Sequence, residues 1–93
     1  MKYTMKAIIE SPEGKEITQN LVAVFFFDEN TYGNKHWLSI HNEASFEQHY
    51  DIRYDSEFNP EQKMVYLVRW ASNFWSGKDG AYSLKEITIK KEE

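Results

Sequence analysis

The sequence contains no cysteine, which excludes a disulfide framework and a thiolate metal site. It has only two prolines and four glycines. It contains no internal repeat, no low-complexity segment and no stretch with the composition of a linker. We therefore expect a single domain over residues 1–93. The longest apolar run, at residues 21–27, is too short to cross a membrane. The N-terminal residues lack the apolar region of a signal peptide, so we expect a cytoplasmic protein without a membrane partner.

The sequence also lacks an excess of basic residues, since its net charge is −4. The charge is distributed unevenly. Residues 28–61 carry eight carboxylates against two basic side chains, a sum of −6. An acidic segment of this kind repels a phosphate backbone, and this composition does not indicate a nucleic-acid-binding protein.

The clearest pattern that is present predicts a helix over residues 60–76. Asn59 is a favourable N-cap, Pro60 suits the first helical position, and Gln62 stands where a capping box requires it. Gly77 supplies the residue at which many helices end. The apolar side chains follow one helical stripe, which Phe74 widens: Met64, Leu67, Val68, Ala71 and Trp75. A stripe of this width requires a sheet as its packing partner.

Patterns on both sides of this helix predict strands. Residues 2–9 alternate between apolar and polar side chains, and a turn at residues 11–14 leads to a second strand at 17–27. The second half of that strand is apolar on both faces, which is typical of a strand in the middle of a sheet or at an interface. Further strands are predicted at residues 35–41 and, after the helix, at 81–90.

Residues 45–55 fit two interpretations. Three aromatic residues recur every four positions, as on a helix: Phe46, Tyr50 and Tyr54. The same segment alternates as a strand with Gln48 as the one polar exception, and its aromatic and β-branched residues favour a strand from residue 49 to 54. A short helical turn at 43–48 is an alternative for its beginning. The sequence therefore predicts an α+β fold with an antiparallel sheet of about five strands, in the order β-β-β-β-α-β, and one amphipathic helix packed on one face.

No pattern indicates a reaction. His36, His41 and His49 match no metal-ligand spacing, and no serine stands in the context of a nucleophile or a phosphate-binding loop. We predict no catalytic residue, no metal and no cofactor, and therefore a protein that is not an enzyme.

The acidic segment offers the first candidate surface. Its carboxylates recur at short intervals, so that they form a ridge on either a helix or a strand: Glu43, Glu47, Asp51, Asp55 and Glu57. A solvated face is one interpretation. The other is a surface that binds a basic partner, such as the nucleic-acid channel of another protein.

The predicted helix offers the second candidate surface, since aromatic residues make up 16% of the chain. Tyr66 and Trp70 stand four residues apart, off the apolar stripe and beside Arg69. These residue types often anchor interfaces, and packing around the sheet edge is the alternative. Stacking of single-stranded bases is a weaker alternative, because the chain has few arginines and an acidic ridge.

Two stretches, YDIRYD at 50–55 and WASNFWSGKDGAYSLKEI at 70–87, resemble small phage and prophage proteins of Gram-positive bacteria. In size and composition the chain is similar to anti-CRISPR proteins. The resemblance implies an inhibitor that blocks a host protein in the bacterial cytoplasm without catalysis, and it assigns no site residue. The first functional hypothesis is thus a protein-binding module directed at a host defence or nucleic-acid-handling protein with a basic surface. The alternative is a homo-oligomeric structural or accessory protein.

Overall fold

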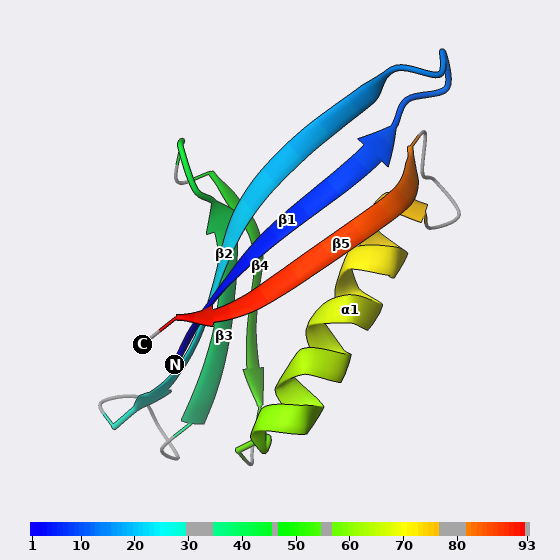
Figure 1. The fold of residues 1–93 in the computed structure, drawn as a ribbon. Coiled ribbons are helices and arrows are strands. Elements are labelled where there is room, and N and C mark those ends of the chain that lie inside the picture. The colour runs from blue at the N-terminus through cyan, green and yellow to red at the C-terminus, as the bar shows by residue number, and fades with distance from the viewer. Residues whose placement is uncertain (30–34, 46, 55–56, 77–81, 93) are drawn as a thin grey trace. The chain divides into compact units, whose positions relative to one another are not determined.

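The computed structural model describes the chain except for residues 30–34, 46, 55–56, 77–81 and 93, together with the side chains of 35 and 52–54. The described part forms five strands and one helix (Figure 1), namely β1 (Lys2–Glu10), β2 (Glu16–Asp28), β3 (Lys35–Asn42), β4 (Gln48–Tyr54), α1 (Pro60–Ser76) and β5 (Ser83–Glu92). The predicted α+β class and element order are confirmed.

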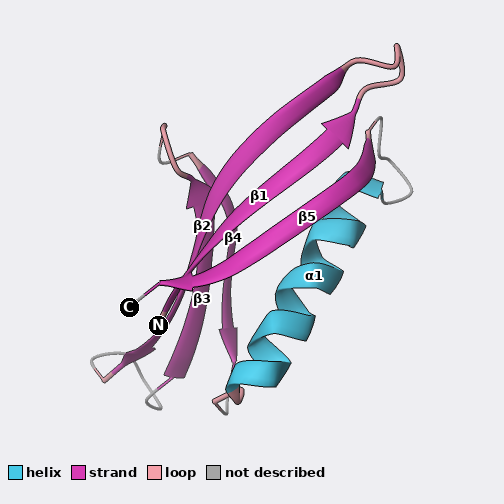
Figure 2. Cartoon of the chain, in the orientation of Figure 1, coloured by secondary structure: helices cyan, strands magenta, loops and turns pink. Residues whose placement is uncertain are grey.

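The strands form one sheet in the order β4-β3-β2-β1-β5, shown in magenta in Figure 2. β3 pairs antiparallel with both β2 and β4. β2, whose apolar run predicted a central strand, is the middle strand of the five. β4 and β5 are the two edge strands, and each has one strand neighbour.

The chain divides into two compact units. The first comprises residues 1–5, 20–57 and 90–93, and the second comprises residues 6–19 and 58–89. The first unit therefore contains all of β3 and β4, and the second contains all of α1 and most of β5. The single-domain organisation stays a prediction.

The core of the first unit follows from the two-residue period of its strands. Phe25 pairs with Leu38 and Ala23 pairs with Ile40, and all four side chains are buried. The buried ring of Tyr3 meets that of Phe25 edge to face, with ring centroids 5.8 Å apart. Burial raises the pKa of the Tyr3 phenol, because the phenolate is poorly solvated there.

The pairing of β3 with β4 contains an irregularity that the sequence pattern did not predict. Ile40 pairs with Tyr50, but His41 pairs with Gln48, so His49 is an extra residue in β4. This two-against-one pairing is a β-bulge. The strand interpretation of residues 49–54 is confirmed, and the predicted alternation changes phase at the bulge.

The bulge explains why Gln48 was the polar exception to the alternation. Beyond His49, Gln48 lies beside Ser39, and its side-chain amide donates a hydrogen bond to the Ser39 hydroxyl at 3.1 Å. The connection before β4 is a turn at residues 43–45 and not a longer helical segment. Asn42 stabilises it, because its side-chain oxygen accepts from the amides of Ala44 and Ser45.

In the second unit, α1 begins with the predicted capping box. The Asn59 side-chain oxygen accepts from the Gln62 amide at 2.8 Å, and the Gln62 side-chain oxygen accepts from the Asn59 amide at 2.9 Å. At the other end, the Ser76 hydroxyl accepts from the Leu84 amide of β5 at 2.8 Å. The predicted C-cap, Gly77, lies outside the described residues.

The buried face of α1 differs from the predicted stripe on one side. It comprises Lys63, Leu67, Trp70, Ala71 and Trp75. Trp70 is 9% exposed, and Val68 is 41% exposed. Of the two alternatives for Trp70, an interface and packing within the fold, its burial supports packing, so Trp70 is not a partner-binding residue. The Trp70 indole stacks on Phe74 and meets the ring of Trp75 edge to face. The buried face of α1 therefore includes Trp70 where the predicted stripe included Val68.

Candidate functional site

The described carboxylates of the predicted acidic ridge are all exposed. Glu43 lies in the turn after β3, Glu47 lies just before β4, and Asp51 lies in β4 opposite Ser39. Glu57 lies in the segment before α1. Asp55 lies outside the described residues.

These carboxylates are spread over several parts of the first unit, since Glu43 lies beside β2, where its backbone amide donates to the Asn20 carbonyl at 2.9 Å. The seven residues of β4 span about 20 Å at the usual rise of a strand. Glu43 and Glu47 stand before its first residue, Asp51 stands within it, and Glu57 follows its last residue. The expectation that the acidic residues share one face of a single element is therefore wrong, because only Asp51 among those described belongs to a strand.

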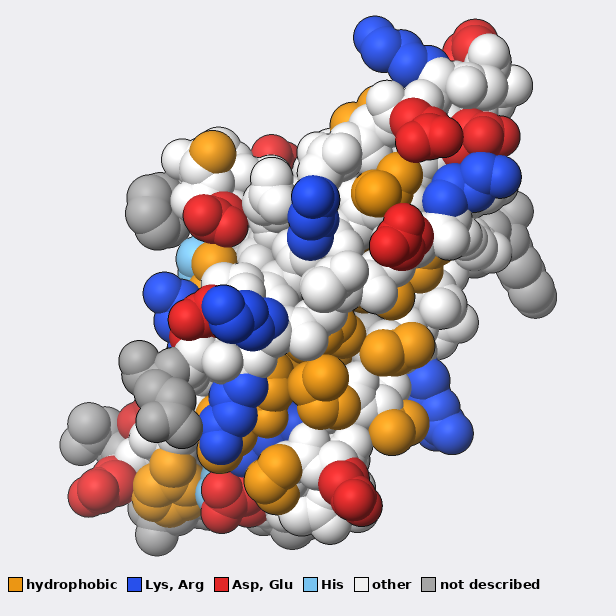
Figure 3. All heavy atoms as spheres, viewed as in Figure 1, with side chains coloured by type: hydrophobic (Ala, Val, Ile, Leu, Met, Phe, Trp, Pro, Cys, Tyr) orange, Lys and Arg blue, Asp and Glu red, His pale blue; other side chains and the backbone are white. Residues whose placement is uncertain are grey.

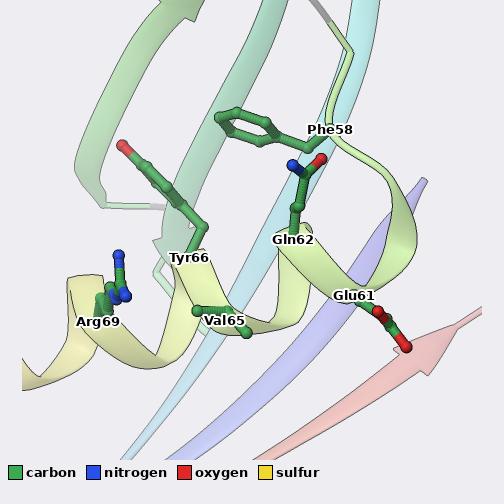
Figure 4. Close-up of a pocket in the computed structure, with 6 residues that line it drawn as sticks. All are labelled: Phe58, Glu61, Gln62, Val65, Tyr66 and Arg69. Carbon is green, nitrogen blue, oxygen red and sulfur yellow. The ribbon is translucent and has the colours of Figure 1, made fainter.

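The outer side of α1 carries an open groove of about 360 Å³ within the second unit (Figure 4). Two rows of side chains line it, and each row has a spacing of four residues. One row consists of Phe58, Gln62 and Tyr66, and the other of Glu61, Val65 and Arg69. Successive members of such a row lie one above the other on a helix, so the groove runs obliquely along α1.

The groove combines an apolar floor with charged ends. The rings of Phe58 and Tyr66 are 5.4 Å apart, and the Val65 side chain is 51% exposed. Glu61 and Arg69 are exposed on the same row, one on each side of Val65. Residues of this kind suit contact with another protein more than binding of a small polar substrate.

Of the three residues predicted on the helix, the structure brings two to this groove. Tyr66 and Arg69 line it, whereas Trp70, one turn after Tyr66, is buried and does not line it. Sequence reasoning missed Phe58 and Val65. The signal that could find Phe58 is its position directly before the N-cap Asn59, where an apolar residue often packs against the first turns of the helix.

A third exposed surface lies at the end of β2 in the first unit. Phe26 and Phe27 are both exposed, and with Asp28 and Glu29 they line an open hollow of about 450 Å³. The Phe26 ring stacks on Trp37 at 6.4 Å. The apolar run of β2 is thus buried only as far as Phe25, and its last two aromatic residues reach the surface.

Neither a metal site nor a membrane span emerges from the described residues. Among them, no group of three or more histidine, aspartate or glutamate side chains could hold a metal ion. Within the same part of the chain, no helix is both long and apolar enough to cross a membrane. His36 and His41 stand at positions of opposite parity on β3, so they face opposite sides of the sheet.

Comparisons with protein-family models, with curated proteins and with solved structures find no match to this chain. The function must therefore be inferred from its own surfaces.

Proposed function

We propose that this chain is a non-enzymatic protein-binding module that binds a basic surface through the carboxylates along β4. One observation carries the proposal: the described carboxylates Glu43, Glu47, Asp51 and Glu57 are all exposed, with Asp51 in the edge strand β4 and Glu47 directly before it. The outer side of an edge strand has no strand neighbour, so a partner protein can approach it.

The spread of the exposed carboxylates favours an elongated partner surface. β4 alone spans about 20 Å, whereas charges are screened over roughly 8 Å at physiological salt. A single cation therefore interacts with only some of them. A basic groove, such as the channel in which another protein holds nucleic acid, meets several of them and is attracted to them from a distance.

The proposed partner is a bacterial host protein, as the sequence resemblance to phage proteins implies. A phage-encoded module that occupies the basic channel of a host defence or nucleic-acid-handling protein excludes the nucleic acid by competition. Inhibition of this kind requires affinity and complementary charge, and no chemical step.

The test is reversal of charge on β4 and in the segment just before it. The double variant Glu47→Lys, Asp51→Lys should lose capture of its partner from a lysate of the bacterial host in a pulldown analysed by mass spectrometry. The matched control is Glu13→Lys, Glu16→Lys, which changes the net charge equally at two exposed residues of the second unit.

The two variants together separate a specific surface from general charge. Loss of capture in the β4 variant alone supports the proposal. Unchanged capture, or an equal loss in the control, contradicts it.

A further inference from the structure

The outer side of α1 carries apolar side chains that its own fold does not bury. Val65 and Val68 are both exposed, and Figure 3 shows hydrophobic side chains at the surface over α1. Valine is also a poorer helix former than alanine or the long polar residues that usually occupy exposed helix positions. This side of α1 is therefore the candidate surface for contact with another molecule.

The groove beside Val65 has the shape that receives another helix. In the commonest packing of two helices, a ridge of residues spaced by four lies in the groove between two such ridges of its neighbour. The row Glu61-Val65-Arg69 is a ridge of that kind, and the other side of the groove is formed by Gln62 and Tyr66 of α1 with Phe58 from the segment before the cap. The occupant is therefore a helix that presents one row with a small apolar residue at its centre.

The row that carries Val65 is itself such a ridge, and its charges are self-complementary. Glu61 precedes Val65 by four residues and Arg69 follows it by four, about 6 Å along the axis in each direction. A second copy running antiparallel about a two-fold axis at Val65 sets Glu61 of each copy opposite Arg69 of the other. A parallel arrangement would instead set like charges together.

We propose that α1 pairs with α1 of a second copy of this chain, antiparallel and centred on Val65. The ridge Glu61-Val65-Arg69 of each copy lies in the groove of the other. Such an interface is isologous, since both copies contribute the same surface. One helix face is small compared with the roughly 1,200 Å² that stable complexes bury, so the dimer is reversible and depends on concentration.

This pairing is independent of the proposed binding along β4, because none of the β4 carboxylates belongs to α1. A dimer that presents two acidic edges binds a partner with two basic sites more tightly than a monomer does. Failure of either proposal leaves the other intact.

A charge exchange tests the arrangement. In the proposed dimer, position 61 of each copy lies opposite position 69 of the other. Glu61→Arg alone therefore creates two pairs of opposed arginines, and Arg69→Glu alone creates two pairs of opposed glutamates. Each single variant should lower the association constant by roughly tenfold, measured by sedimentation equilibrium at low salt over a series of concentrations. The double variant Glu61→Arg, Arg69→Glu restores opposite charges and should return to within about threefold of the unchanged chain.

Circular dichroism of each variant shows whether α1 has formed, so that loss of folding is recognised. With the helix intact, recovery in the double variant supports the antiparallel pairing. The proposal is overturned if the unchanged chain keeps its monomer mass of 11.1 kDa throughout the series, or if the double variant does not recover.

The absence of cysteine permits a second, independent test. Val65→Cys introduces the only thiol of the chain, and the two-fold axis brings two such thiols together, within reach of a disulfide. Oxidation should give a covalent dimer on a non-reducing gel. Thr18→Cys, at an exposed position of β2, is the matched control and should remain monomeric. Equal crosslinking of both variants contradicts the pairing.

Discussion

The inner and outer sides of α1 carry similar apolar side chains in very different surroundings. Leu67 and Ala71 are fully buried, whereas Val65, two residues before Leu67, is half exposed. On a helix, two residues apart means almost opposite sides. The comparison shows that apolar character alone does not identify the buried side of this helix, because α1 also carries apolar residues on its exposed side.

The largest effect that sharpens this comparison is expected at Trp70, which the structure places on the inner side. Trp70→Ala removes a buried indole that contacts Phe74 and Trp75, and should lower the free energy of unfolding by about 3–5 kcal/mol. Urea denaturation followed by circular dichroism measures it. A loss below about 1 kcal/mol, as is usual for exposed positions, would contradict the burial of Trp70.

Leu67→Ala should cause the second largest loss in the free energy of unfolding. Its side chain is completely buried at the centre of the inner side, so its truncation leaves a cavity and costs about 2–5 kcal/mol. The midpoint of urea denaturation gives the difference, with Leu67→Met as a control of similar volume that should cost less than about 1.5 kcal/mol. If both changes have the same effect, packing around Leu67 is not what stabilises this side.

Asn59→Ala removes the cap at the start of α1 and changes neither its buried side nor its exposed side. It removes the acceptor of the Gln62 amide and should cost about 1 kcal/mol. Thermal denaturation measures the change. Asn59→Asp keeps the acceptor, so it should retain most of the stability, and an equal loss in both variants would argue against the cap.

The smallest effect is expected on the outer side. In dilute solution, Val65→Ala should change the free energy of unfolding by less than about 0.5 kcal/mol, because an exposed side chain is lost and alanine favours the helix. In concentrated solution the same change should weaken self-association, measured by sedimentation. A large loss of stability at high dilution would mean that Val65 belongs to the inner side.

The sequence predicts those features that depend on residues close together along the chain. The capping box at Asn59 and Gln62 and the order of the six elements could be predicted, because each rests on local spacing. The bulge at His49 could not, since it is defined by the register of β4 against β3. The burial of Trp70 depends on what the rest of the fold places around its ring, which periodicity does not report.

The candidate surfaces were predicted only in part for the same reason. Carboxylates could be located by composition, but the placement of Asp51 at the edge of the sheet depends on β4 being an edge strand. Tyr66 and Arg69 could be recognised by residue type. Phe58 joins them because the chain before the helix cap turns its ring toward Tyr66, a contact made outside the helical repeat.

The position of β1 between β2 and β5 has a consequence for how the chain acquires its structure. Thr4 donates a hydrogen bond to the Glu92 carboxylate at 3.3 Å, across 88 residues of sequence. A hairpin such as β1–β2 closes within microseconds, whereas synthesis of the residues from the end of β2 to the end of β5 takes roughly 3–13 seconds at about 5–20 residues per second. During that interval one edge of β1 stays open to other chains. We therefore expect addition of β5 to be the slow step of folding and the stage at which the nascent chain is most prone to aggregate.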